Sequence, residues 1–282
     1  MRTVYLILHR SKPNVRALLL QLIRAFQGGG IAVSCEPWLM QQMDAKQAAG
    51  LLSEEGAAPD AVVSVGGDGT FLRASQFAAK NDIPLFGINM GRTGFLAEVE
   101  LEQLDEVCRR LKEGAFTVES RMMLEASLGK GETLLALNDI VVSRGGYARL
   151  IAIKVWVDQE LVGRYHADGL IVSSPTGSTG YSLSAGGPIV FPGVECMILC
   201  PICAHSLQHR PVVISSRQTV TLELDCEPQQ RVQLSADGQE ALPLSAQQKI
   251  VITRSGTQVR FIHFFEQDFF SIIRQKLSEW SC

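Results

Sequence analysis

The stretch AVVSVGGDGT, residues 61–70, decides the fold of the first part of the chain. It begins with an apolar, β-rich run typical of a buried strand, passes through a glycine-rich turn, and leads into residues 70–79, which have helical spacing. In open parallel sheets, ligands bind beyond the carboxyl ends of the strands, where helix N-termini present backbone donors to phosphate. The stretch therefore predicts a strand, a turn suited to polyphosphate, and a helix.

Asp68 is the carboxylate on this turn. The glycines around it would let the backbone approach phosphate oxygens closely, while Asp68 could accept a hydroxyl proton or help to hold a metal ion. The alternative is a tight turn in which Asp68 only caps the helix. Because the turn matches neither the Rossmann fingerprint nor the lysine-containing Walker A loop, it indicates a phosphate-binding turn of another type.

The first ~115 residues alternate short β-rich runs with helical stretches, the pattern of a parallel sheet covered by helices. The predicted strands are residues 4–8, 31–35, 61–65 and 84–88, and the predicted helices are residues 13–26, 44–55, 70–79 and 101–112. Residues 1–115 are therefore predicted to form an α/β nucleotide-binding domain.

Beyond Gly114 the pattern changes to β-rich runs separated by turn signals such as Asp237-Gly238. The predicted strands here are residues 134–143, 150–157, 161–165, 195–200, 219–224 and 248–253. Helical periodicity returns at residues 266–280. We therefore predict a mostly β domain over residues 116–265, and a C-terminal helix over residues 266–282 that packs on the N-terminal domain.

Two shorter segments carry further candidate residues. Residues 87–97 form a second glycine-rich loop after a strand, in which Phe95 either lines a nucleotide pocket or belongs to the core. Asn138 and Asp139 interrupt an apolar run, where an amide and a carboxylate could chelate the vicinal hydroxyls of a ribose. A simple bend or bulge is the alternative for this pair.

The longest segment, residues 168–188, is rich in hydroxyl groups and glycine. Thr176 and Thr179 offer donors and acceptors among several serines, and Tyr181 offers a ring on which a base could stack. A flexible Ser/Gly linker is disfavoured by the apolar runs that flank the segment. The segment therefore predicts a nucleotide-binding loop.

Composition narrows the class of protein. With 46% hydrophobic and 20% charged residues and a net charge of −3, the chain reads as an ordinary globular protein without a general attraction for nucleic acid or anionic membranes. No apolar run reaches the ~18 residues of a membrane span, and the seven cysteines do not form a disulfide pattern. We therefore predict a cytoplasmic protein with neither nucleic acid nor membrane as a partner.

One cluster has the spacing of a metal site. Cys200, Cys203, His205 and His209 are close enough in sequence to surround a zinc ion. However, residues 195–200 read as a buried strand in which small cysteines pack well. Structural cysteines are therefore the favoured interpretation, and no metal-ligating residue is predicted.

Taken together, these segments resemble the NAD kinase family over roughly residues 62–239. The turn at residues 66–69 and the pair Asn138-Asp139 are similar to the two short motifs of that family, and residues 175–188 are similar to its long glycine-rich motif. The resemblance implies that Asp68 is the proton acceptor. The residues expected to bind the dinucleotide are Gly69, Arg73, Phe95, Asn138, Asp139, Arg149, His166, Asp168, Thr176, Thr179, Gly180, Tyr181, Ser182, Leu183, Ser184 and Gln239.

The chain departs from the commonest family pattern at three of these positions. Asp139 stands where Glu is frequent, Gly180 where Ala is frequent, and His166 where some relatives carry Arg. The first two changes are small, because a carboxylate acceptor is kept and one methyl group is lost. The change at His166 bears on the preference for NAD or NADH.

The resemblance also implies a β-sandwich C-terminal domain, NAD and ATP as substrates, and a divalent cation such as Mg²⁺. It further implies a homotetramer or homodimer, in which Asp168 can reach the NAD site of a neighbouring subunit. Two alternatives stay open: another kinase with the same Gly-Gly-Asp-Gly turn, acting on a lipid or a sugar phosphate, and a non-catalytic module that senses NAD. The second would not need the carboxylate of Asp68.

Overall fold

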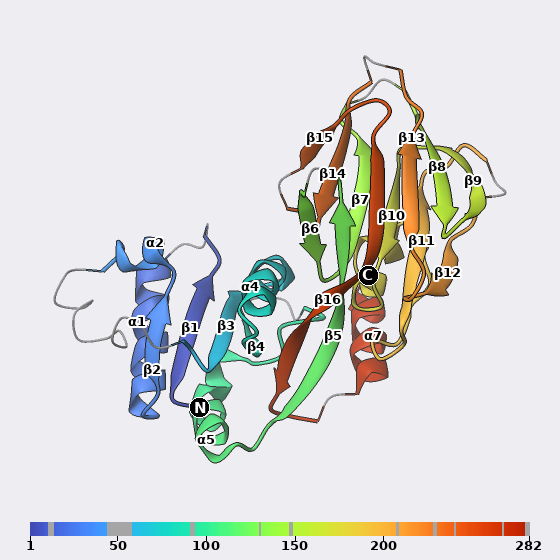
Figure 1. Ribbon diagram of the computed structural model, residues 1–282. Helices are drawn as coiled ribbons and strands as arrows, with labels where there is room; N and C mark the ends of the chain where they lie inside the picture. Colours follow the sequence, from blue (N-terminus) through green and yellow to red (C-terminus); the bar gives the residue numbers. More distant parts are fainter. Residues whose placement is uncertain are drawn as a thin grey trace. The chain divides into compact units, whose positions relative to one another are not determined.

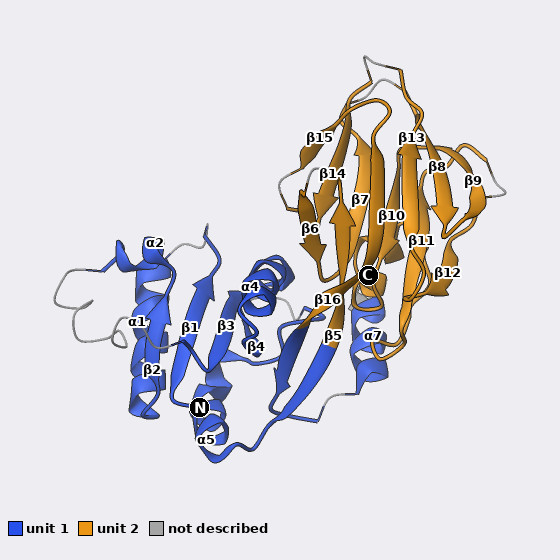
Figure 2. Cartoon of the chain, in the orientation of Figure 1, with its two compact units in different colours: residues 1–120, 259–282 blue, residues 121–258 orange. Residues whose placement is uncertain are grey.

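The computed structural model describes residues 1–10, 14–43, 58–90, 94–129, 131–146, 149–206, 209–227, 230–239, 241–266 and 268–279. The chain forms two compact units, residues 1–120 with 259–282 and residues 121–258 (Figure 2). The division falls within the two strands β5 (Thr117–Ser127) and β16 (Lys249–His263), so each of these strands belongs to both units.

Unit 1 is built on a parallel sheet (Figure 1). Its strands are β1 (Thr3–Leu8), β2 (Ala32–Cys35), β3 (Ala61–Gly66) and β4 (Leu85–Asn89), in the order β2-β1-β3-β4. The last part of β16 pairs in parallel with β4, at Phe261 and Leu85. The predicted parallel α/β sheet is thus confirmed.

Helices cover both faces of this sheet. The helices of unit 1 are α1 (Val15–Gly28), α2 (Pro37–Met40), α4 (Asp68–Lys80), η1 (Leu101–Gln103), α5 (Leu104–Glu113) and α7 (Phe269–Glu279), of which α1, α5 and α4 pack on the sheet. The apolar faces of α1 and α5 share one core with alternate strand residues such as Leu6 and Val63. Helix α4 packs on the other face, where Phe71 meets the ring of Phe261 edge-on. The predicted helix over residues 44–55 lies outside the described residues.

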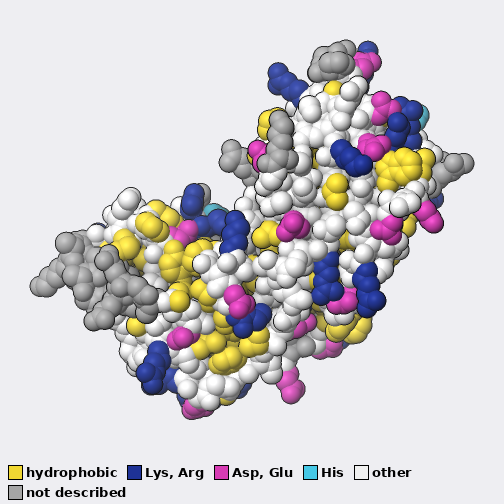
Figure 3. Space-filling model, viewed as in Figure 1, with side chains coloured by type: hydrophobic (Ala, Val, Ile, Leu, Met, Phe, Trp, Pro, Cys, Tyr) yellow, Lys and Arg dark blue, Asp and Glu magenta, His cyan; other side chains and the backbone are white. Residues whose placement is uncertain are grey.

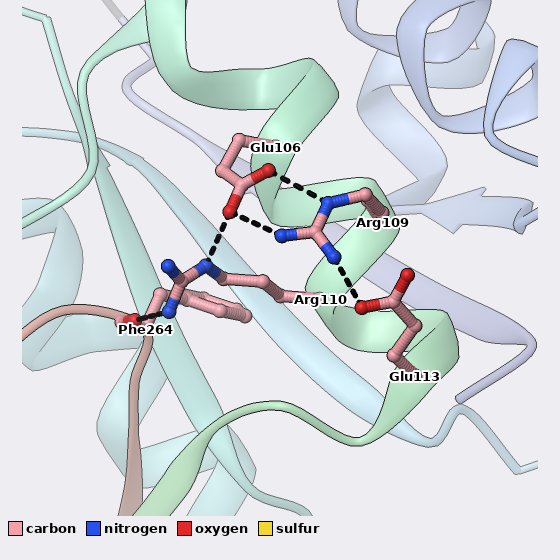
Figure 4. A network of polar contacts seen from close by, with 5 residues as sticks. All are labelled: Glu106, Arg109, Arg110, Glu113 and Phe264. Carbon is pink, nitrogen blue, oxygen red and sulfur yellow. Dashed lines mark hydrogen bonds and ion pairs between the residues drawn. The ribbon is translucent and has the colours of Figure 1, made fainter.

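Helix α5 is joined to the end of β16 by an ionic network (Figure 4). The carboxylate of Glu106 accepts hydrogen bonds from Arg109 and Arg110, at 2.6 Å for Arg110 Nε, and Arg109 also pairs with Glu113. Arg110 donates a further bond to the carbonyl of Phe264. These arginines lower the pKa of Glu106 to about 2, so the network stays charged at any ordinary pH.

Unit 2 is a sandwich of two largely antiparallel sheets. One sheet contains β5, β6 (Thr133–Ala136), β8 (Ile151–Val157), β9 (Glu160–Ala167), β13 (Val220–Leu224) and β16. The other contains β7 (Asp139–Arg144), β10 (Gly169–Ser173), β11 (Cys196–Ile202), β12 (Val212–Ser215), β14 (Val232–Ala236) and β15 (Leu242–Leu244). Apolar residues from both, such as Ile153 and Val172, form one core. The predicted sandwich is confirmed.

The predicted strand over residues 134–143 is wrong as a single element. The chain leaves one sheet after β6 and enters the other at β7, with Leu137 and Asn138 between them. The physical reason is that the backbone N–H groups of both residues donate to the carboxylate of Asp237 instead of to a neighbouring strand. The bend considered as an alternative for Asn138-Asp139 therefore exists, and it carries the candidate residues.

The predicted strand over residues 248–253 is too short. Strand β16 is fifteen residues long in total and includes the polar run Ser255-Gly256-Thr257-Gln258. A polar run hides the period-2 pattern of a strand, but Ser255 is nevertheless buried and its hydroxyl bonds to Glu125 of β5 at 3.4 Å. Partners on neighbouring strands thus extend an element that local hydrophobicity does not predict.

The surface is mixed in charge. On the face drawn in Figure 3, basic and acidic side chains are interspersed rather than gathered into one field. Among the described residues, no helix has both the length and the apolar composition needed to span a bilayer.

Candidate active site

In unit 1 the candidate site is the turn between β3 and α4. Strand β3 ends at Gly66 and α4 begins at Asp68, so Asp68 lies in the first turn of a 13-residue helix. A negative charge is favourable there because of the helix dipole. A side chain at position 66 would place its Cβ 2.6 Å from the hydroxyl of Thr70, so only glycine fits this strand end. Gly69, the next candidate, is exposed on the same turn.

Asp68 is held by the second glycine-rich loop. Its Oδ2 accepts the backbone N–H of Phe95 at 3.0 Å, and its Oδ1 accepts that of Leu96 at 3.2 Å. The loop also approaches closely at Gly94, where a Cβ would come within 2.0 Å of Oδ1. The two glycine-rich segments of the sequence therefore meet at one carboxylate, and Phe95 contributes its backbone to this contact.

Arg73 is engaged within unit 1. Its guanidinium forms an ion pair with Glu36 and donates to the carbonyl of Leu8 at 2.6 Å. These bonds connect α4 to the ends of β1 and β2. In this arrangement Arg73 orients the elements around the turn, and its role toward a dinucleotide stays a prediction.

In unit 2 the candidate ribose-binding pair lies at the bend between β6 and β7. Asn138 is half-buried and Asp139 is buried, with 5% of its surface exposed. Burial, followed by the charge of Asp237, raises the pKa of Asp139 to about 7. The Oδ1 atom of Asn138 is buried without a hydrogen-bond partner among the described residues. An acceptor left in this state is suited to bind a ligand.

The segment 168–188, which contains the long motif, folds against this bend. It forms β10, the 3-10 helix η2 (Thr176–Thr179) and the short helix α6 (Tyr181–Ser184). A Cβ on Gly180 would lie 3.3 Å from Nδ2 of Asn138, so Gly180 and Asn138 are neighbours. The alanine that is frequent in the family would therefore touch the amide without a severe clash.

The hydroxyl groups of the motif serve two purposes. Ser178 is fully buried, and its Oγ bonds to both the carbonyl and the N–H of Val190, while Thr176 and Ser182 are also buried. Tyr181, by contrast, is 47% exposed, and its pKa is raised by partial burial and by nearby Cys203, Asp139 and Asp168. The buried hydroxyl groups of the motif thus stabilise the loop, whereas Tyr181 lies on its surface near Asp139 and Asp168. Thr179 and Leu183 are half-buried and Ser184 is exposed.

The remaining candidates lie at the ends of other strands of unit 2. Asp168 forms an ion pair with Arg144, with 2.7 Å between Oδ1 and Nε. Arg149 pairs with Glu227 and, together with Arg144, lines a cavity of about 430 Å³. His166 and Gln239 are both exposed, and Gln239 lies two residues after Asp237.

The possible zinc cluster has a structural role at Cys200. This side chain is fully buried, and its thiol donates to the carbonyls of Ser182 and Ala185 at 3.8 and 3.5 Å. Cys203 is exposed. Within the part of the chain that the structure describes, no three His, Cys, Asp or Glu side chains are grouped as a metal site would require.

Four residues that shape the candidate site were not predicted: Gly94, Arg144, Ser174 and Asp237. In the sequence, the pair Asp237-Gly238 indicates only a turn, because Asp-Gly is typical of a hairpin turn. The turn is real, since Asp237 and Gly238 have φ angles of 54° and 65°. Asp237 also accepts the backbone N–H groups of Leu137 and Asn138. No local pattern indicates this, because these partners are about one hundred residues away in sequence.

Family models match most of the chain. The model for the ATP-NAD kinase N-terminal domain matches residues 31–116, and the model for the ATP-NAD kinase C-terminal domain matches residues 137–264. The NAD kinase of Moorella thermoacetica is 39% identical over 282 residues, which are 99% of this chain and 90% of that protein. The NAD kinase of Desulforamulus reducens is 43% identical over 231 residues, 80% of each chain.

Solved structures agree with these matches. An NAD kinase from Archaeoglobus fulgidus in complex with ATP has a TM-score of 0.74 at 28% identity and covers 99% of both chains. Yeast NADH kinase complexed with NADH has a TM-score of 0.82 at 23% identity, over 99% of this chain and 88% of that one, and shows the common fold. Sequence and fold together place this chain in the NAD kinase family, a family of phosphotransferases.

Proposed function

We propose that this protein transfers the terminal phosphoryl group of ATP to the 2′-hydroxyl of the adenosine ribose of NAD and so produces NADP. The observation that carries the proposal is the carboxylate of Asp68, fixed by two backbone N–H groups on the glycine-rich turn at the end of β3. Family membership supports the same reaction, and the relatives named above are NAD kinases.

Asp68 is the proposed general base. A carboxylate oxygen takes the proton of the 2′-hydroxyl while the hydroxyl oxygen attacks the terminal phosphorus, and the bond from that phosphorus to ADP breaks in line. Because little covalent chemistry is left to the protein in such a transfer, its main task is to position the reactants. A carboxylate held by two hydrogen bonds is already oriented, which suits this task.

NAD binding is assigned to unit 2. Asn138 and Asp139 bind the hydroxyls of the nicotinamide-side ribose, and Tyr181 offers its exposed ring to a base. The proposal keeps the remaining predicted positions, among them Gly180 beside Asn138 and Asp168 with its partner Arg144. Yeast NADH kinase, which has the same fold, was solved in complex with NADH, and this supports a dinucleotide as the ligand here.

A divalent cation, such as Mg²⁺, would accompany ATP. Hard cations of this kind bind carboxylate and phosphate oxygens and need few protein ligands in kinases. The turn offers one carboxylate, that of Asp68, so the phosphate oxygens of ATP would supply most of the ligands. Bound to the phosphates, the cation would neutralise the charge that builds up during transfer.

Assembly and location follow the family. We propose a homodimer or homotetramer in the cytoplasm, in which Asp168 reaches the NAD site of a neighbouring subunit. Light scattering should show an oligomer, and a fully active monomer would contradict this assignment.

The decisive experiment is incubation of the protein with NAD, ATP and Mg²⁺, followed by detection of NADP with an NADP-specific dehydrogenase. NADP should accumulate in proportion to enzyme and time. NAD binding without NADP formation would indicate an NAD-sensing module. Phosphorylation of a lipid or a sugar phosphate in place of NAD would indicate another kinase with the same turn.

A further inference from the structure

We propose that Asp237 is a positioning residue for NAD: its carboxylate holds the backbone of residues 137–139 so that the side chains of Asn138 and Asp139 are presented to the ribose. This inference rests on the proposed function, in which these two side chains bind NAD. It adds a residue that acts through them and is not itself expected to touch the substrate.

The first observation is a carboxylate that accepts three backbone donors in a row. Oδ2 of Asp237 accepts the N–H of Leu137 at 2.9 Å. Oδ1 accepts the N–H of Asn138 at 2.7 Å and that of Asp139 at 3.3 Å. Asp237 is 8% exposed, so these bonds are shielded from water. Bonds to a charged acceptor are the stronger kind of protein hydrogen bond, and a buried donor that loses its acceptor is costly.

The second observation is that the opposite side of the same segment is held as well. The carbonyl of Leu137 accepts the hydroxyl of Ser174, and the carbonyl of Asn138 accepts the N–H of Ser174 at 2.8 Å. The carbonyl of Asp139 accepts the N–H of Asp237 at 2.9 Å. All six backbone polar groups of residues 137–139 are therefore satisfied within unit 2.

This arrangement leaves the two candidate side chains available. Because the backbone needs nothing from them, they do not have to cap the bend themselves, although Asn and Asp often do so in turns. Oδ1 of Asn138 is indeed buried without a partner among the described residues. The bend therefore holds the backbone of two ligand-binding residues in a fixed position. Such preorganisation reduces the conformational entropy that is lost on binding.

The carboxylate of Asp237 also acts on Asp139 through its charge. Two buried carboxylates close together oppose each other's ionisation, and burial followed by the charge of Asp237 raises the pKa of Asp139 to about 7. Tyr181 is a further titratable group that interacts with Asp139. The charge state of Asp139, and with it the binding of ribose hydroxyls, should therefore change near neutral pH, mainly because Asp139 is buried and in addition because Asp237 is close to it.

Asparagine cannot replace Asp237 in this position. An Asn side chain has one acceptor oxygen, and its NH₂ group would face an N–H donor of the bend. Asp237→Asn should therefore raise the KM for NAD about tenfold or more, with the KM for ATP changed much less. It should also move the pH dependence of the NAD KM to lower pH, because the charge that opposes ionisation of Asp139 is gone.

A second variant covers the case in which Asp237→Asn does not fold. Asp237 lies in the left-handed region at φ 54°, where glycine is favoured, so Asp237→Gly removes the carboxylate and keeps the turn. Calorimetric titration of this variant with NAD should show the same loss of affinity and the same pH shift. Circular dichroism of both variants confirms the fold.

Asp158 provides a matched control. It also lies at φ 54° on a turn of unit 2, and its Oδ1 accepts the backbone N–H of Thr219 at 2.9 Å. Asp158→Gly removes a similar bond from a turn that holds no candidate residue, and Asp158→Asn removes the charge but keeps one acceptor oxygen for Thr219. They should lower stability without changing the NAD KM or its pH profile.

Two outcomes separate the proposals. If Asn138→Ala leaves the NAD KM unchanged, the ribose assignment in the proposed function fails. If Asn138→Ala raises it but both Asp237 variants bind NAD as the wild type does, with the same pH profile, the positioning role of Asp237 is overturned.

Discussion

The carboxylate of Asp68 accepts a hydrogen bond from the backbone N–H of Phe95, with 3.0 Å between Oδ2 and N. The bond joins the first turn of α4 to the loop that follows β4. Both residues come from glycine-rich segments, and both segments lie in unit 1. The proposed general base is therefore oriented by the backbone of its neighbour before substrate arrives.

Asp68→Asn tests the base directly. The change keeps the size of the side chain but removes the basic carboxylate, so kcat should fall by about 10² to 10⁴. NAD affinity, measured by calorimetry, should change much less. Retained NAD binding with a kcat close to that of the wild type would show that Asp68 is not the base.

Asp60 offers the control for this variant. It also accepts two backbone N–H groups, those of Arg2 and Thr3, but through the single oxygen Oδ2 and at the start of β1. Asp60→Ala removes this acceptor and should therefore reproduce the structural cost of its loss, visible in Tm, while kcat stays close to that of the wild type.

Gly94→Ala tests the position of Asp68 rather than its chemistry. An added Cβ would lie 2.0 Å from Oδ1, so the loop and the carboxylate must separate. We expect kcat to fall tenfold or more, because misplacement by ~1 Å can cost a factor of 10². In Gly256→Ala the new Cβ meets open space, and steady-state assays should find its activity unchanged. Equal activity of the two variants would argue against a fixed base.

Asn138→Ala tests the ribose assignment. Loss of a buried hydrogen-bonding group typically costs ~1 to 3 kcal/mol, so the KM for NAD should rise clearly while the KM for ATP changes less. Initial-rate measurements with each substrate varied in turn give both constants. An equal loss for ATP and NAD, or no loss for either, would count against the assignment.

His263 predicts a pH dependence of stability. Its Nδ1 contacts Glu98, and its Nε2 lies 3.1 Å from Oε2 of Glu119, all within unit 1. Burial lowers the pKa of His263, but the hydrogen bonds and charges of the two glutamates outweigh it and raise the pKa to about 9. Since the folded-state pKa is above the unfolded value of about 6.5, the stabilisation is complete below pH ~6.5 and is lost as pH rises through about 9.

His263→Gln removes the titrating group. The wild type should exceed this variant in unfolding free energy by roughly 1 to 3 kcal/mol at pH 6, and by less at pH 10. Urea unfolding at both pH values measures the difference. An equal difference in unfolding free energy at pH 6 and pH 10 would show that His263 does not stabilise the protein through its charge beside Glu98 and Glu119.

Much of this architecture can be predicted from the sequence. Periodicity locates the strands and helices of unit 1, because apolar spacing within one segment reflects the face that it buries. The glycine turn with Asp68, the pair Asn138-Asp139 and the motif at residues 175–188 are each continuous in the chain, so they can be recognised without knowing what they touch. Family membership was predictable for the same reason, and it is confirmed.

Only the tertiary structure decided how these segments are held. The break between β6 and β7 exists because Asp237, far along the chain, takes the backbone donors of Leu137 and Asn138. Arg73 meets Glu36 across unit 1, and Phe95 orients Asp68 through a backbone group that has no signature in the sequence. Local pattern determines which segments fold and what chemistry they carry. Contacts between distant residues form only when the chain is compact, so they alone determine which groups are fixed and which are left to bind a ligand.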